Sequence, residues 1–150
     1  MRRAFTIVEL LVVMALVALM AGSGAAISLS AGRKKAVDRA AEDLATAMRQ
    51  ARDFAQAGKK DLSCGQSLDG WQVIVETTRY TVQGKCGSPF GVRQINFLGG
   101  VTATNGTGTI LFKPLSLGTD LTSSRIITLS VSGFTQKVSI TNQGEVKVGP

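Results

Sequence analysis

An apolar stretch near the N-terminus constrains this chain more than any other feature. From position 5 to position 32 the sequence holds a single charged side chain, Glu9, and basic residues flank the stretch at positions 2–3 and 33–35. A helix of 28 residues is about 42 Å long, which exceeds the bilayer core of about 30 Å. The sequence therefore predicts a transmembrane helix over residues 5–32, behind a leader of residues 1–4.

Glu9 is unusual in such a stretch. A carboxylate inside a membrane segment costs up to about 2.5–3.5 kcal/mol at the bilayer centre and less near an end, so it calls for a partner charge. An ordinary secretory signal peptide is the alternative interpretation, with Ser23-Gly24-Ala25 as the cleavage site and a mature chain that starts near Ala26. The apolar run continues past that site, which favours the membrane helix.

Residues 33–58 have the pattern of an amphipathic helix. Apolar side chains recur at steps of three or four and mark one narrow, alanine-rich face, made of Val37, Ala40, Leu44, Met48, Ala51 and Ala55. Gly58 is typical of a helix C-terminus. Gly22 and Gly24 weaken the helix before this segment, since each glycine costs about 1 kcal/mol relative to alanine.

The remaining residues, 59–150, show the alternation of short β-strands separated by glycine-containing turns. The most strand-like run is Arg125–Val131, and Asn105-Gly106-Thr107-Gly108 is typical of a hairpin turn. Without a second helical pattern, these strands favour one antiparallel sheet. We therefore expect an α+β fold, in which a long N-terminal helix, membrane-spanning in its first half and amphipathic in its second, packs on a C-terminal antiparallel β-sheet domain.

The two cysteines can form a disulfide if the C-terminal part lies beyond the membrane. Cys64 and Cys86 are the only two cysteines, and both lie beside glycine-containing turns. If the C-terminal part lies outside the cytoplasm, a disulfide between them is favoured over two reduced thiols. Closing a loop of about 20 residues stabilises a fold by about 3 kcal/mol in the chain-entropy model.

The composition argues against an enzyme. The chain has no histidine, so the commonest general base and the commonest metal ligand are both missing, and we expect no catalytic residue, no metal and no cofactor. Asp69, Glu76 and Asp120 are the best-placed carboxylates of the C-terminal part, but their spacing matches no acid–base motif.

The first residues carry a specific resemblance. Phe5-Thr6-Ile7-Val8-Glu9-Leu10-Leu11 behind a short basic leader resembles the class III signal of type IV pilins and type II secretion pseudopilins. The resemblance implies that a prepilin peptidase cuts between Ala4 and Phe5 and methylates the new amine of Phe5. Glu9, the fifth mature residue, would then pair with the N-terminal amine of a neighbouring subunit. The sequence departs from the family at Ala4, where glycine is usual.

The C-terminal part resembles the GspH/FimT group of minor pilins and pseudopilins. The resemblance rests on Phe112-Lys113-Pro114 with Gly118, on the strand-like runs 126–130 and 138–140, and on 144–148. It implies a structural subunit that helps to initiate or cap a type IV pilus or a type II secretion pseudopilus. The implied partners are other pilin or pseudopilin subunits, the prepilin peptidase and, before assembly, the bacterial inner membrane, with the C-terminal domain in the periplasm.

A DNA-binding minor pilin is the alternative function. The net charge of +7 permits contact with nucleic acid or anionic lipid, although a modestly basic solubility surface is the favoured explanation. Some FimT-like proteins bind DNA through a Gly-Arg-x-Arg element, and the matching positions here run from Gly144 to Lys147. Glu145 replaces the first arginine and repels phosphate, which disfavours DNA. The remaining candidate contacts are Lys147, Lys137 and Arg125.

Overall fold

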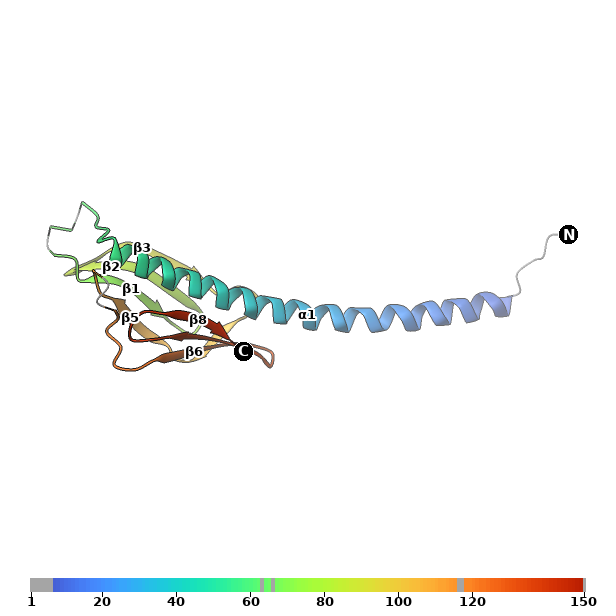
Figure 1. The fold of residues 1–150 in the computed structure, drawn as a ribbon. Helices are drawn as coiled ribbons and strands as arrows, with labels where there is room; N and C mark the ends of the chain where they lie inside the picture. Colours follow the sequence, from blue (N-terminus) through green and yellow to red (C-terminus); the bar gives the residue numbers. More distant parts are fainter. Residues whose placement is uncertain (1–6, 63, 66, 116–117, 150) are drawn as a thin grey trace.

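A computed structural model of the chain describes residues 7–62, 64–65, 67–115 and 118–149. One long helix, α1 (Ile7–Gln56), covers 50 residues and is about 75 Å long. Its first half projects away from the rest of the molecule, and its second half lies along the strands (Figure 1). The helix passes without interruption through positions 22–24, where the sequence predicted a weak point.

Eight strands follow α1 in the described part of the chain: β1 (Gly70–Val75), β2 (Arg79–Cys86), β3 (Ser88–Asn96), β4 (Thr102–Asn105), β5 (Gly108–Phe112), β6 (Arg125–Val131), β7 (Phe134–Ile140) and β8 (Val146–Gly149). Every pair of neighbouring strands is antiparallel. The predicted α+β class, with a long helix packed on antiparallel strands, is confirmed. The strands form two four-stranded sheets instead of the single expected sheet, with orders β3-β2-β1-β5 and β4-β6-β7-β8.

The turn after β4 connects the two sheets. β4 pairs with β6 in one sheet, whereas β5 pairs with β1 in the other, so β4 and β5 are not partners. The prediction of a hairpin at 105–108 was therefore wrong. A turn does occur there, with Gly106 at a φ of +73°, but partners distant in the sequence decide which sheet each flanking strand joins.

The core lies between α1 and both sheets. All six positions of the predicted helix face are buried, and their exposed fractions do not exceed 8%. The sheets contribute large buried side chains, among them Phe112, Ile110, Ile127, Leu129 and Ile140. Because three of the six helix-face residues are alanines, the helix backbone can approach the strands closely.

The end of α1 is fixed by backbone hydrogen bonds. The Gly58 N–H donates to the Ala55 carbonyl at 3.1 Å, and the Lys59 N–H donates to the Phe54 carbonyl at 2.9 Å. With a φ of +61° at Gly58, this is the Schellman arrangement that glycine favours. The predicted role of Gly58 is confirmed, and the chain turns back there toward the strands.

Polar contacts tie α1 to the second sheet along its length. Gln136 of β7 donates to the Asp38 carboxylate at 3.1 Å. Further along the helix, Arg49 donates to the Val146 carbonyl and Arg52 to the Gly144 carbonyl, each at 3.4 Å. The second half of α1 is therefore fixed in its orientation on the domain.

Candidate functional site

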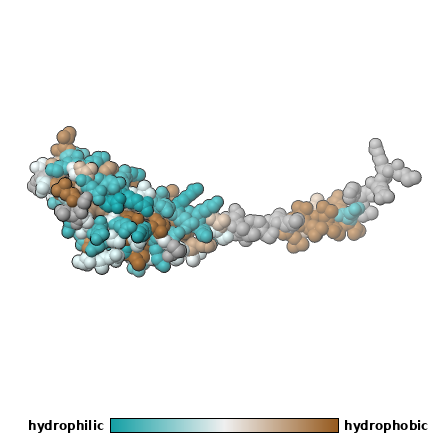
Figure 2. Space-filling view, viewed as in Figure 1, coloured by the Kyte–Doolittle hydropathy of each residue, from teal (hydrophilic) through white to brown (hydrophobic). Residues whose placement is uncertain are grey.

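The first half of α1 is an apolar surface that the rest of the chain does not cover. The large apolar side chains between Ile7 and Leu19 are each 52–81% exposed. They lie on all sides of the helix, far from the domain (Figure 2). Such a continuous apolar surface marks an interaction site, because water is a poor environment for it.

Glu9 lies in the first turn of α1 and is exposed. A carboxylate at a helix N-terminus is favoured by the helix dipole. Ala4 and Phe5, the residues of the predicted cleavage site, lie outside the described residues. None of the helices within the described ranges combines the length and the apolarity of a membrane span. The membrane helix over residues 5–32 stays a prediction.

A disulfide joins the loop between α1 and β1 to the end of β2. Cys64 and Cys86 are joined, with their Cα atoms 5.9 Å apart, so the sequence-based pairing agrees with the structure. Beside it the Asp69 carboxylate accepts a hydrogen bond from the Gly87 N–H at 3.0 Å. The loop is thus held against the β2–β3 turn at the end of the domain remote from the N-terminus (Figure 1).

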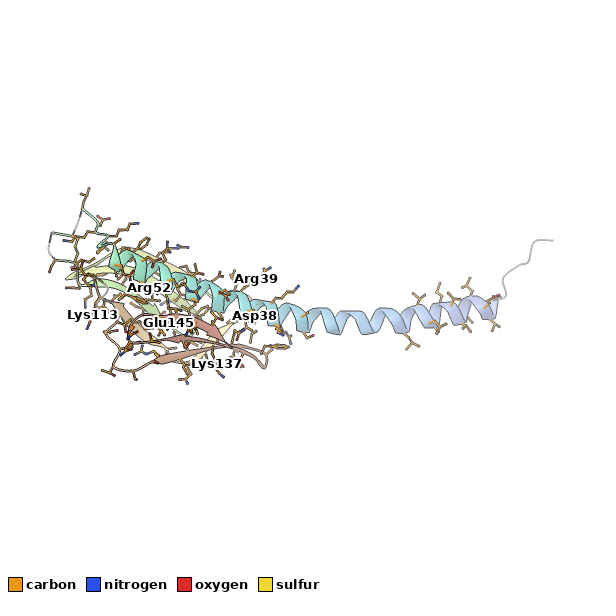
Figure 3. The ribbon with its side chains drawn as sticks, viewed as in Figure 1. Asp38, Arg39, Arg52, Lys113, Lys137 and Glu145 are labelled. Carbon is orange, nitrogen blue, oxygen red and sulfur yellow. A yellow bond between two sulfur atoms is a disulfide. The ribbon has the colours of Figure 1, made fainter. Side chains whose placement is uncertain are left out.

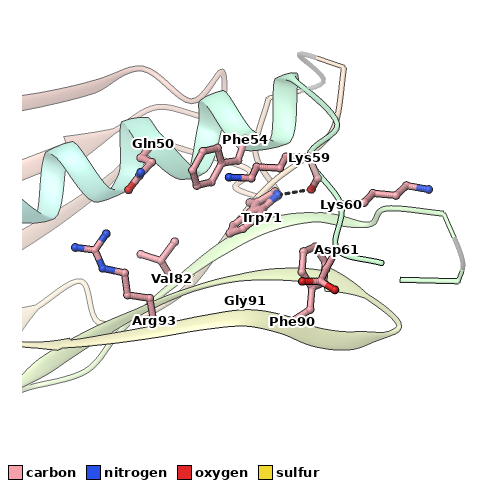
Figure 4. A pocket seen from close by; sticks show the side chains of 10 residues that line it. All are labelled: Gln50, Phe54, Lys59, Lys60, Asp61, Trp71, Val82, Phe90, Gly91 and Arg93. Carbon is pink, nitrogen blue, oxygen red and sulfur yellow. Dashed lines mark hydrogen bonds between the residues drawn. The ribbon is translucent and has the colours of Figure 1, made fainter. Parts of the chain in front are cut away.

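An aromatic pocket of about 350 Å³ lies next to this loop (Figure 4). The Trp71 ring packs between Phe54 and Phe90, with centroid distances of 4.8 and 5.5 Å. The Trp71 indole N–H donates to the Lys59 carbonyl at 3.0 Å, and the Lys59 ammonium lies 4.0 Å from the centre of the Phe54 ring. These contacts hold the side chains of the pocket in place at the edge of the core.

A second cleft, of about 430 Å³, lies between α1 and β3 nearer to the N-terminal half of the helix. Tyr80 and Phe97 form its apolar wall, with ring centroids 5.6 Å apart. Burial raises the pKa of the Tyr80 phenol, and the Asp43 carboxylate raises it further, whereas Arg93 lowers it. Sequence reasoning missed this cleft, because helix and strand positions about fifty residues apart build it.

The three candidate DNA contacts do not form one patch. The register places Lys137 and Lys147 on the outer face of their sheet, whereas Arg125 has the same orientation as the buried Ile127. The Arg125 guanidinium donates to the Thr109 carbonyl of β5 at 3.0 Å and so joins the two sheets. Figure 3 shows Lys137, which belongs to β7, and Glu145, which directly precedes β8.

Lys147 is engaged within the chain. Its ammonium forms an ion pair with the Glu145 carboxylate at 3.0 Å. The same glutamate that replaces an arginine of the DNA-binding element therefore neutralises the lysine that remains.

The carboxylates considered for catalysis have structural partners. Asp69 binds the Gly87 N–H, as described above, and the Asp120 carboxylate accepts from the Leu111 N–H at 2.9 Å. Glu76 pairs with Arg79 and raises the pKa of that guanidinium. Among the described residues, no three potential metal-ligating side chains lie together.

Comparison with known families gives two matches. Residues 1–25 match the prokaryotic N-terminal methylation motif, which places the chain in the class of pilin-like proteins. Residues 40–144, more than half of the chain, match the family described as type II transport protein GspH. The chain belongs to the GspH family. Such families are structural subunits of type II secretion or type IV pilus assemblies, not enzymes. No curated protein and no solved structure gives a significant match.

Proposed function

We propose that this chain is a minor subunit that helps to initiate or cap a pilus or pseudopilus. The observation that carries the proposal is the exposed apolar half of α1, which lies within the methylation motif and continues as one helix into the domain. The helix would be held in the inner membrane before assembly, with the domain in the periplasm. Within a fibre, neighbouring helices would then cover the same apolar surface.

The N-terminal residues have specific roles in this proposal. A prepilin peptidase cuts between Ala4 and Phe5 and methylates the Phe5 amine. Glu9 pairs with the Phe5 amine of an adjacent subunit, and the pair sets the register between the two helices. In apolar surroundings, removing one partner of such a pair costs about 3–5 kcal/mol, so the contact discriminates strongly between registers.

Intact mass spectrometry of the membrane-extracted chain, with and without co-expressed prepilin peptidase, tests the processing step. We expect a chain that begins at N-methylated Phe5 only when the peptidase is present. A start near Ala26 would establish the ordinary signal peptide instead. An intact Met1 in both samples would contradict processing.

A matched pair of variants tests the role of Glu9. We expect Glu9→Gln to be cleaved normally but to enter fibres at least tenfold less, because the charge partner of the amine is lost. Glu42→Gln makes the same change on the exposed side of the same helix and should leave incorporation unchanged. Equal incorporation of both variants, measured by immunoblotting of sheared fibres, would contradict the proposed pairing.

A further inference from the structure

The cleft between α1 and β3 lies where the N-terminal half of the helix leaves the domain. Its apolar lining consists of Ala36, Ala40, Tyr80, Ile95, Phe97 and Leu98, and we call it the helix-exit cleft. Tyr80 is buried, whereas Leu98 is 79% exposed and extends the apolar lining to the surface. A volume of about 430 Å³ falls within the range of ligand-binding pockets, about 300–1,000 Å³.

Basic side chains border the helix-exit cleft on one side. Arg39 is part of its lining, and Lys35 lies one turn earlier on the same side of α1. Both side chains are exposed. The Asp43 carboxylate also lines the cleft, next to Tyr80. The positively charged Arg93 lies in the same region as Asp43 and Tyr80. The outer end of the cleft therefore presents two cations next to an apolar hollow.

The position of the cleft along α1 matches the surface of a bilayer. A helix over residues 5–32 is about 42 Å long, close to the 40–45 Å of a bilayer with its headgroups. Lys35 and the first residue of the cleft, Ala36, follow within about 6 Å along the helix axis. Lys35 and Arg39 then lie about 5 and 10 Å beyond residue 32, so their long side chains can extend back toward the lipid phosphates, whereas the aromatic pocket beside Trp71 lies at the remote end of the domain.

We propose that the helix-exit cleft binds an anionic phospholipid while the subunit is anchored in the membrane. Arg39 and Lys35 hold the phosphate, since a guanidinium can donate two parallel hydrogen bonds to it. One acyl chain lies in the hollow against Tyr80, Phe97 and Leu98. The inference rests on the proposed function, because it requires the membrane anchor.

A photoreactive lipid tests the site on the full-length chain. The chain is reconstituted into phosphatidylcholine nanodiscs that contain phosphatidylglycerol with a diazirine in one acyl chain, and crosslinks are mapped by mass spectrometry. We expect crosslinks within residues 5–32 and, in addition, within residues 95–98. The same probe with a phosphatidylcholine headgroup should label residues 95–98 at least fivefold less.

Two double variants separate the site from general charge attraction. Lys35→Gln with Arg39→Gln should lower the labelling of 95–98 at least fivefold relative to that of 5–32. Lys113→Gln with Lys137→Gln removes the same charge from exposed positions outside the cleft and should change nothing. Figure 3 shows Lys113 at the opposite end of the domain from Arg39.

The remaining outcomes each overturn a defined statement. Labelling confined to residues 5–32 refutes the lipid site and leaves the membrane anchor intact. Labelling of 95–98 that is indifferent to headgroup or to the Lys35 and Arg39 changes also refutes it. If residues 5–32 are not labelled either, the anchor itself is refuted, and the lipid site fails with it.

Discussion

Replacing Gly106 with alanine tests the turn at which the chain crosses between the sheets. Gly106 has a φ of +73°, and its N–H is bound by the Asn105 side-chain oxygen at 2.8 Å. A Cβ atom at this position would lie 2.1 Å from the Ile126 carbonyl oxygen and 2.9 Å from the Ile127 Cα atom. Both are backbone atoms of β6, so no side-chain rotation can relieve the overlap.

The substitution Gly106→Ala is expected to lower the free energy of unfolding for two reasons. A non-glycine residue in the left-handed region costs about 1–2 kcal/mol, and overpacking against a fixed neighbour costs about 1–3 kcal/mol more. Gly133→Ala is the matched control, because Gly133 has a φ of +88° with no atom within 4 Å of the added Cβ. Gly133→Ala should therefore lower the free energy of unfolding by only about 1–2 kcal/mol, whereas Gly106→Ala should lower it by about 2–5 kcal/mol.

Urea unfolding of the full-length chain in detergent micelles measures this difference. Trp71 is the only tryptophan and is 6% exposed, so its fluorescence reports unfolding of the sheet domain. With a slope of about 1.5 kcal/mol per molar urea, the midpoint of Gly106→Ala should lie about 0.7–2 M below that of Gly133→Ala. Equal midpoints would refute the argument that β6 backbone atoms exclude a side chain at the crossing.

Two further predictions concern the disulfide and the buried phenol. Replacing Cys64 and Cys86 with serine should lower the free energy of unfolding by about 3 kcal/mol, because the bond constrains the unfolded chain; an unchanged urea midpoint would contradict this. Tyr80 is the only tyrosine, so absorbance at 295 nm should show one titration with a pKa above 10, where burial and Asp43 place it. Because the pKa of Tyr80 is higher in the folded state than in the unfolded state, the protonated phenol contributes to the free energy of unfolding fully below pH 10, and this contribution is lost as pH rises through the folded-state pKa. Tyr80→Phe should abolish that loss of stability at high pH. A measured pKa at or below 10 would contradict the assignment.

Features encoded by local spacing could be predicted from the sequence. The buried face of α1 follows from apolar residues at steps of three and four, and its end follows from Gly58. The methylation motif is likewise a short contiguous pattern. Each of these depends on neighbours within a turn or two of helix, which one sequence displays directly.

Features that depend on distant pairing could not be predicted. The sequence around Gly106 indicates a turn but not that β4 and β5 join different sheets, because β6 and β1 make that choice. Arg125 has the charge of a phosphate ligand, yet its donor is used by the Thr109 carbonyl across the two sheets. The helix-exit cleft exists only once β3 lies beside α1.

The packing of α1 against both sheets determines how the domain responds to a force applied along the helix. Buried helix residues from Val37 to Ala55 contact strands of both sheets, and the helix continues without a break, along a gentle curve, into the first half of α1 (Figure 1). A pull on that half acts along the helix axis and shears all of these contacts together, instead of peeling them apart one at a time. The Cys64–Cys86 disulfide at the far end of the domain adds a covalent link between the loop after α1 and β2. Tension applied to the first half of α1 therefore reaches the domain through the whole helix–sheet contact at once.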